Sequence, residues 1–145
     1  MSLGRRDWTL LTIAAAEGAP VTPVQLQKSL FLLGQELPNI VGPRYYAFEA
    51  YNYGPFDAAV YRDAENLAVQ GLVDIERPEG ARYNQYRISA DGRAKAEELR
   101  QQAPQQALKY LATVVQWARG LSFPELVRAI YAKYPQYRVN SVFSG

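Results

Sequence analysis

An aromatic stretch at residues 45–56 holds the side chains best suited to bind a partner. Six of its twelve positions are aromatic, and four of the chain's eleven tyrosines lie in it. Tyrosine joins an apolar ring to a polar hydroxyl, which suits a half-buried strand, a protein interface or a stacking platform. Only Arg44 and Glu49 carry charge between residues 39 and 56, as is typical of interfaces. The predicted protein-binding residues are Tyr45, Tyr51, Tyr53 and Phe56.

Two other interpretations of these rings stay open. Rings at strand alternation often pack in a core while the hydroxyl reaches water, and this applies to Tyr46, Tyr51 and Tyr53. The rings could also stack on nucleic-acid bases, but the lack of nearby lysine disfavours that interpretation.

Chemistry by catalytic side chains has little support in the sequence. The chain contains no cysteine and no histidine, which excludes disulfides, zinc sites built from these residues, and Ser-His-Asp or Cys-His catalysis. It also lacks a phosphate-binding Gly-Lys-Ser/Thr loop, a dinucleotide-binding glycine fingerprint and a nucleophile elbow. No cluster of carboxylates suggests a magnesium or calcium site. We therefore predict a non-enzymatic protein with no catalytic residues, no metal site and no cofactor.

A second set of residues would suit DNA. A helix predicted at residues 55–70 stands where a winged helix places its recognition helix, and a hairpin follows it. Against DNA, this helix carries Asp57, Asp63 and Glu65 but only one arginine, so its net charge is 1 − 3 = −2, and carboxylates near phosphates weaken binding. A solvated surface of mixed charge is the alternative. The candidate DNA-binding residues are Arg62, Asn66, Arg77, Arg82, Arg87 and Arg93.

The elements that would position these side chains begin with helices. Apolar spacing predicts a first helix at residues 7–17 and a second from Pro23, with Thr22 and Gln25 as a capping box. Leucines at positions 26, 30, 33 and 37 form a stripe so wide that this helix is either central to a core or in contact with a partner. Pro38 ends it, residues 39–43 read as a loop, and alternation predicts a strand at residues 44–51.

After the helix at residues 55–70, the pattern predicts strands at residues 72–77 and 83–89 around a hairpin tip. Ser89 is the expected N-cap of a helix reaching about residue 103, and further helices follow at residues 105–119 and from Ser122, which forms a capping box with Glu125. We predict a mostly helical α+β fold. It forms a single domain over residues 1–145, with a winged-helix-like core at about residues 7–103 and C-terminal helices at about residues 105–135.

Three pieces of sequence, taken together, resemble the Panacea antitoxin domain family and its uncharacterised bacterial relatives. They are Leu-Gln-Lys-Ser-Leu-Phe-Leu-Leu at residues 26–33, the Tyr-Asn-Tyr-Gly-Pro exit at residues 51–55 with Val60 and Tyr61, and Ile-Tyr-Ala-Lys-Tyr-Pro at residues 130–135. The resemblance implies a non-enzymatic domain that neutralises a toxin or regulates another protein. The wing-like hairpin at residues 74–89 departs from that pattern and favours winged-helix relatives.

The composition limits which kinds of partner the protein can be expected to bind. Sixteen Lys and Arg against fourteen Asp and Glu give a net charge of +2, which by itself does not indicate nucleic acid. No apolar run has the length of a membrane span, and we expect a cytoplasmic, bacterial protein. The primary hypothesis is a protein-binding regulator or antitoxin whose partner is a toxin or a regulatory protein, and the alternative is a DNA-binding transcription regulator. The stripe from Leu126 to Tyr134 would either form a homodimer or pack against the chain's own core.

Overall fold

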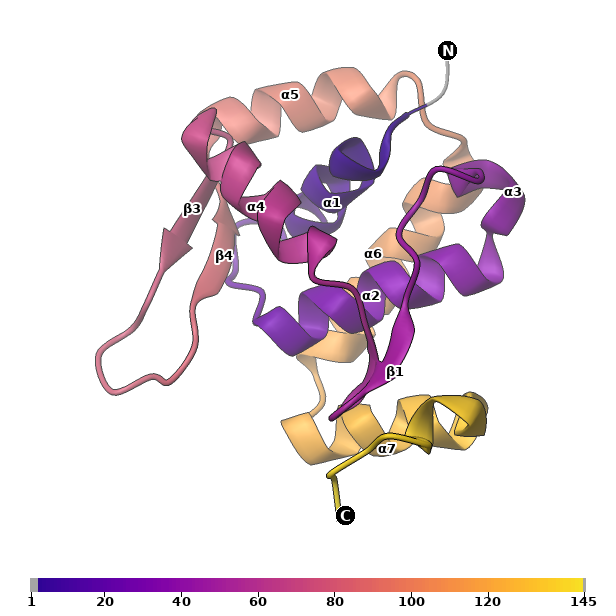
Figure 1. The fold of residues 1–145 in the computed structure, drawn as a ribbon. Coiled ribbons are helices and arrows are strands. Elements are labelled where there is room, and N and C mark those ends of the chain that lie inside the picture. Colours follow the sequence, from indigo (N-terminus) through magenta and orange to yellow (C-terminus); the bar gives the residue numbers. More distant parts are fainter. Residues whose placement is uncertain (1–2, 145) are drawn as a thin grey trace.

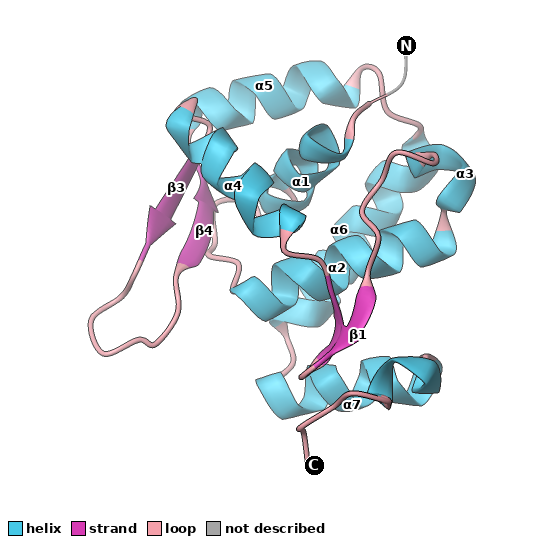
Figure 2. Cartoon of the chain, viewed as in Figure 1, coloured by secondary structure: helices cyan, strands magenta, loops and turns pink. Residues whose placement is uncertain are grey.

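Helices dominate the chain, as the computed structural model shows for residues 3–144 (Figure 1). The predicted mostly helical α+β class is confirmed, and the strands form two separate antiparallel hairpins (Figure 2). In chain order the elements are α1 (Arg5–Ala14), α2 (Pro23–Glu36), α3 (Pro38–Val41), β1 (Glu49–Tyr51), β2 (Gly54–Phe56), α4 (Ala59–Val69), β3 (Val73–Glu76), β4 (Gln85–Ile88), α5 (Ala90–Arg100), α6 (Gln105–Arg119), α7 (Phe123–Lys133) and the 3₁₀ turn η1 (Pro135–Arg138).

The first part of the chain has a winged-helix-like arrangement. Helix α1 packs against α2 and α4, and the β3–β4 hairpin follows α4 as a wing. Val21, between α1 and α2, adds a third strand position to this hairpin. Its backbone exchanges two hydrogen bonds of 2.8 Å with Tyr86 on β4. The wing is thereby attached to the helical core at its base.

Side-chain caps fix the helix starts that the sequence predicts. The Gln25 amide donates to Thr22 Oγ1 at 3.3 Å, and the Thr22 amide donates to Gln25 Oε1 at 2.9 Å. Ser122 and Glu125 form the same reciprocal pair at α7. Each box satisfies amide groups that the first helical turn leaves without intrahelical partners.

Helix α2 lies in the middle of the molecule (Figure 1) and contacts α1, α6, α7 and strand β2. Leu26, Leu30, Phe31 and Leu33 are at most 1% exposed. The wide apolar stripe therefore marks a central core helix rather than a surface for a partner. No helix in the described part of the chain is long and apolar enough to cross a membrane.

Three sequence predictions around the aromatic stretch are wrong in their bounds. Only Glu49–Tyr51 of the strand expected at residues 44–51 is a strand, and Pro38–Val41 is a helical turn rather than a loop. The helix expected at residues 55–70 begins at Ala59, because Gly54–Phe56 forms strand β2 and pairs with β1. Gly54 has a φ of +104°, a conformation that glycine adopts without steric cost. The chain can therefore turn back at this point.

Helices α6 and α7 complete the core. Helix α6 has the bounds expected from the sequence and packs against α2 and α1. The apolar stripe of α7 faces inward, since Leu126, Val127, Ile130 and Tyr131 are each at most 4% exposed. This stripe packs against the chain's own core and so offers no surface for a homodimer.

Candidate functional site

A groove of about 890 Å³ opens where five parts of the chain meet. Its walls are the start of α2, the β1–β2 hairpin, the first turn of α4, the tip of the wing and the junction between α6 and α7. We call it the aromatic groove after the six rings that line it, which are Tyr51, Tyr53, Phe56, Tyr61, Tyr83 and Phe123.

The β1–β2 hairpin presents the rings on one wall. Tyr51 pairs with Gly54 across the hairpin, and its ring stacks on Phe56 with 4.9 Å between the centroids. Tyr53, in the turn, meets Phe123 of α7 edge to face at 5.1 Å. Tyr51 is 52% exposed and Tyr53 is 44% exposed. Their contacts hold these rings in place and leave about half of each surface open to a partner.

Lys28 of α2 also lines the groove, and it is only 3% exposed. Its Nζ donates a hydrogen bond of 3.0 Å to the Pro55 carbonyl. Burial lowers the pKa of Lys28 to about 8, because a low-dielectric environment disfavours the ammonium form. Among residues 3–144, this ammonium group forms no ion pair with a carboxylate.

The residue next to Lys28 fastens the exit of the hairpin. Gln27 Nε2 donates to the Asp57 carbonyl at 2.9 Å, and the Asp57 amide donates to Gln27 Oε1 at 3.1 Å. The Gln27-Lys28 pair thus fixes the segment between β2 and α4 from the side of α2. This gives a physical role to two of the buried polar residues of α2.

Three of the four predicted protein-binding residues come together in the groove, and Tyr45 does not. The Tyr45 hydroxyl donates to the Leu30 carbonyl at 2.6 Å, and its ring lies against Gly34. Burial raises the pKa of this hydroxyl well above its usual value. Tyr45 is therefore part of the packing between the 42–48 segment and α2.

Sequence reasoning missed Lys28, Tyr61, Tyr83 and Phe123 as members of the site. The one local signal is Lys28, a lysine within the apolar run of α2. Tyr83 lies in the hairpin tip and Phe123 at the start of a helix. Nothing in their neighbourhoods along the chain connects either residue to the β1–β2 hairpin.

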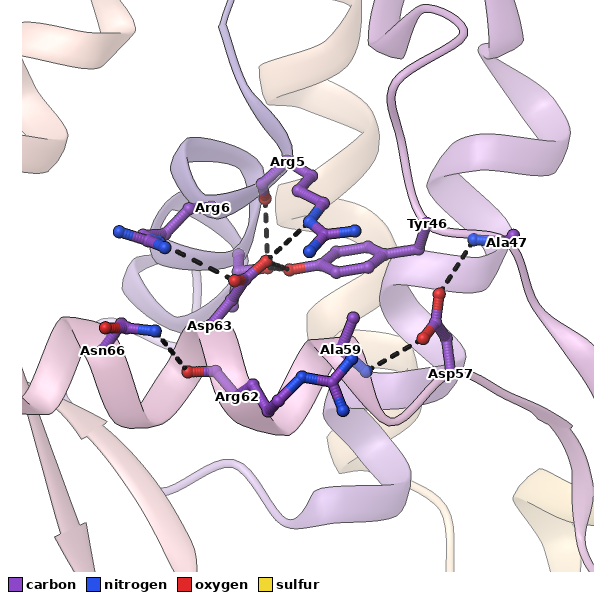
Figure 3. Close-up of polar contacts among 10 residues, drawn as sticks. Arg5, Arg6, Tyr46, Ala47, Asp57, Ala59, Arg62, Asp63 and Asn66 are labelled. Carbon is purple, nitrogen blue, oxygen red and sulfur yellow. Dashed lines mark hydrogen bonds and ion pairs between the residues drawn. The ribbon is translucent and has the colours of Figure 1, made fainter.

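Two of the three carboxylates in the α4 region bind groups of the protein itself. The exposed face of α4 therefore carries less negative charge than the sequence predicts. Asp63 is 4% exposed; it accepts a hydrogen bond from Tyr46 at 2.7 Å and pairs with Arg5 Nε at 3.0 Å (Figure 3). Arg6 Nε lies 3.7 Å away. The Asp57 carboxylate accepts from the Ala47 and Ala59 amides. Two of the three acids that weigh against DNA are therefore already bound within the protein.

The candidate DNA-binding residues differ in how exposed they are and in the bonds they form within the protein. Arg62 and Asn66 are exposed on α4, and the Asn66 side chain donates to the Arg62 carbonyl (Figure 3). Arg87 is half-buried; it donates to the Gly18 carbonyl at 2.6 Å and pairs with Glu76 at 3.5 Å. The structure thus gives Arg87 a role in the fold.

The other three arginines are exposed but do not share one setting. Arg77 donates to Asn84 at 3.3 Å across the hairpin, and Arg82 lines the aromatic groove. Arg93 lies against Gly18. Among residues 3–144, no three His, Cys, Asp or Glu side chains gather where they could hold a metal ion.

Comparison with known proteins adds little. No family model and no curated protein matches the chain. A crystal structure described as a probable transcriptional regulator from Pseudomonas aeruginosa is similar over 91% of this chain and 78% of the other, with 21% identity and a TM-score of 0.38. At this TM-score the backbones differ too much for the likeness to support a fold or a function.

Proposed function

We propose that this chain is a non-catalytic binding protein whose aromatic groove holds an extended segment of another protein. The observation that carries the proposal is the groove itself. Half of the eight large apolar side chains that are exposed in the described chain, namely Tyr51, Tyr53, Tyr83 and Phe123, line this one hollow. Exposed apolar surface concentrated in this way marks an interaction site.

The rings suit a protein partner more than a small polar substrate. Tyrosine and phenylalanine are enriched at protein interfaces, and tyrosine is frequent among the residues that dominate binding energy. Ring contacts such as Tyr51 with Phe56 hold the side chains before a partner arrives, which reduces the entropy lost on binding. The resemblance to antitoxin domains suggests a toxin or a regulatory protein as the partner, in the cytoplasm.

Selection from a phage-displayed library of random peptides tests the proposal, followed by affinity measurement on synthetic copies of the selected peptides. Tyr53→Ala and Phe123→Ala are each expected to weaken binding about tenfold or more, as truncation of central interface aromatics does. Trp117→Ala is the matched control, because Trp117 is a similarly exposed aromatic that does not line the groove. Its affinity should stay within about twofold of the wild type.

Two results would overturn the proposal. One is a selection that yields no peptide with measurable affinity for the folded protein. The other is a set of peptides that bind the Tyr53→Ala and Phe123→Ala variants as tightly as the wild type. Circular dichroism of each variant confirms that the fold is intact before affinities are compared.

The second candidate function is DNA binding through α4 and the wing, and the inward position of Asp63 and Asp57 favours it. With these acids bound inside the protein, Arg62 and Asn66 stand on the exposed face of α4 beside one acid, Glu65. Fluorescence anisotropy with a labelled duplex tests this function. Arg62→Ala should weaken binding and reduce the salt dependence of log affinity by about one contact. Affinity that does not change with salt would argue against it.

A further inference from the structure

The charged side chains that line the aromatic groove all have one sign. Eighteen described residues line it, and among them are Lys28 and Arg82 but no Asp or Glu. The chain as a whole has fourteen acidic residues, so their absence from this surface sets it apart from the rest of the protein. A groove of aromatic walls with two cations is complementary to a partner that combines apolar and acidic side chains.

Lys28 is the position in the groove where an acidic group of the partner would bind. An ammonium group carries three donors, and within residues 3–144 Lys28 makes one hydrogen bond, to the Pro55 carbonyl. It forms no ion pair with any described carboxylate, in contrast to Asp63, which has two arginines. A buried charge without a counter-charge is costly to the fold. An anion that enters the groove would supply the missing partner.

We propose that the groove recognises an extended acidic peptide of the partner protein and places a side-chain carboxylate against Lys28. Apolar side chains on either side of that carboxylate pack on the rings of Tyr51, Tyr53 and Phe123. Arg82, exposed on the wing, pairs with a second acidic side chain at the rim. This inference rests on the proposed function and specifies the chemistry of the partner.

The other titratable groups near Lys28 are tyrosines and one arginine. The β1–β2 hairpin contributes Tyr51 and Tyr53, α4 contributes Tyr61, and the wing contributes Arg82 and Tyr83. Tyr131 of α7 lies behind Gly54, and its hydroxyl donates to Ser141. Lys28 has a pKa of about 8, so a change in its protonation on peptide binding can be measured near that pH.

The first experiment repeats the library selection with wild-type protein and with Lys28→Met, which keeps the side-chain length and removes the charge. Wild-type selections should be enriched in Asp and Glu beside apolar residues. Lys28→Met selections should keep the apolar residues and any acid that pairs with Arg82, and lose the acid at the position that faces Lys28. Apolar peptides without acidic enrichment from the wild type would overturn this inference while leaving the proposed function intact. A selection without groove-dependent binders would overturn both.

The second experiment uses one selected peptide, acetylated and amidated so that only side-chain carboxylates remain, and its Glu→Gln twin. The wild type should bind the acidic peptide about tenfold more tightly than the twin, which corresponds to 1.4 kcal/mol. Lys28→Met should reduce that ratio to about twofold or less, and the exposed control Lys95→Met should leave it unchanged. Equal affinity of the wild type for both peptides would refute the proposal.

Proton uptake on the wild-type protein keeps the test valid if Lys28→Met fails to fold. A group with a pKa of about 8 is half protonated at pH 8, and a bound carboxylate would complete its protonation. Calorimetry in buffers of different ionisation enthalpy should therefore show uptake of about half a proton at pH 8 and almost none at pH 6. Binding without proton uptake at pH 8 would contradict a carboxylate paired with a Lys28 side chain whose pKa in the free protein is about 8.

Discussion

Two buried charged residues, Asp63 and Lys28, differ in whether the described chain supplies an opposite charge. Asp63 accepts a hydrogen bond from Tyr46 and forms ion pairs with Arg5 and Arg6, so the cost of burying its charge is compensated within the chain. Within residues 3–144, the Lys28 ammonium group has one hydrogen-bond partner, the Pro55 carbonyl. The first arrangement joins α1, α4 and the segment before β1. The second leaves a buried cation beside the aromatic groove without a counter-charge among the described residues.

Asp63→Asn should destabilise the protein by about 1–3 kcal/mol. The change removes the charge that Arg5 and Arg6 neutralise and forces the Tyr46 hydroxyl to bond to an amide. The loss stays below the upper range for buried pairs because both arginines are more than 40% exposed and remain hydrated. Urea denaturation measures the effect. Asp74→Asn, an exposed site on β3, is the control and should change stability by less than about 0.5 kcal/mol.

Lys28 should make the protein more stable as pH rises from about 7.5 to 9.5. Its pKa of about 8 in the fold lies below that of an unfolded lysine near 10.4. In this window the unfolded chain binds more protons than the folded one, so the free energy of unfolding increases with pH, by about 2 kcal/mol in total. Urea denaturation at several pH values measures the slope, and Lys28→Met should abolish it.

The window ends below pH 10 because the tyrosines act in the opposite sense. Burial raises the pKa of Tyr86 and of Tyr134 to about 12. Their stabilising effect is present below the unfolded pKa near 10 and is lost as pH rises through the folded value. A flat wild-type profile between pH 7.5 and 9.5 would show that the Lys28 ammonium is not desolvated as the structure indicates.

At the scale of elements, the wing and α5 meet in a close joint. The Ser89 hydroxyl donates to the Gly71 carbonyl at 2.6 Å and accepts from the Gly92 amide at 2.9 Å. Gly92, in the first turn of α5, lies so close to the Leu72 carbonyl that a side chain there would collide with it. Glycine at this position allows α5 to approach the start of β3.

Gly92→Ala should therefore destabilise the protein by about 2–3 kcal/mol, because a methyl group would force the Leu72 backbone and the Ile88 side chain to move. Gly120→Ala provides the control. A Cβ at Gly120 would lie at an ordinary distance of 3.5 Å from two carbonyl oxygens, and the residue has a negative φ. Thermal unfolding should show a clear loss for the first variant and little change for the second. Equal melting temperatures would contradict the close approach.

At the scale of the whole molecule, the aromatic groove depends on α7. This helix supplies Phe123 and Leu126 to the groove wall and buries Leu126, Val127, Ile130 and Tyr131 against the rest of the chain. Four buried side chains of this size contribute about 6–12 kcal/mol of hydrophobic free energy, before the entropy of ordering the helix is subtracted. We therefore expect the C-terminal helices to unfold together with the rest of the chain.

A chain that ends at Gly120 should consequently lose its cooperative unfolding transition and its near-ultraviolet circular dichroism signal. Helical signal in the far ultraviolet can persist without fixed packing. A chain that ends at Arg138 is the control. It should keep a cooperative transition with a lower midpoint, since it retains α7 but loses the hydrogen bonds of Asn140 and Ser141 to the β1–β2 hairpin. A sharp transition in the shorter chain would show instead that the winged-helix-like part folds independently of the C-terminal helices.

The sequence by itself determined the features that depend on near neighbours in the chain. The Thr22–Gln25 and Ser122–Glu125 caps each join residues three positions apart, and the apolar period of α2 and α6 repeats over single turns. The capped starts of α2 and α7 and the wing could therefore be predicted. The stripe of α2 left a central core helix as one of two interpretations. Tyr51, Tyr53 and Phe56 could be proposed as a site because they lie within six residues of one another.

Only the tertiary structure decided which of these residues meet the rest of the groove. Tyr45 packs against α2 and donates a hydrogen bond to the Leu30 carbonyl. Asp63 is buried because Arg5 and Tyr46, from other parts of the chain, bind its carboxylate. Lys28 and Phe123 reach the Tyr53 region from positions 25 residues before and 70 residues after it. Helix α4 begins at Ala59 rather than at residue 55, because residues 54–56 pair with β1 as strand β2. Such contacts depend on packing between elements, which local hydrogen bonds and periodicity do not encode.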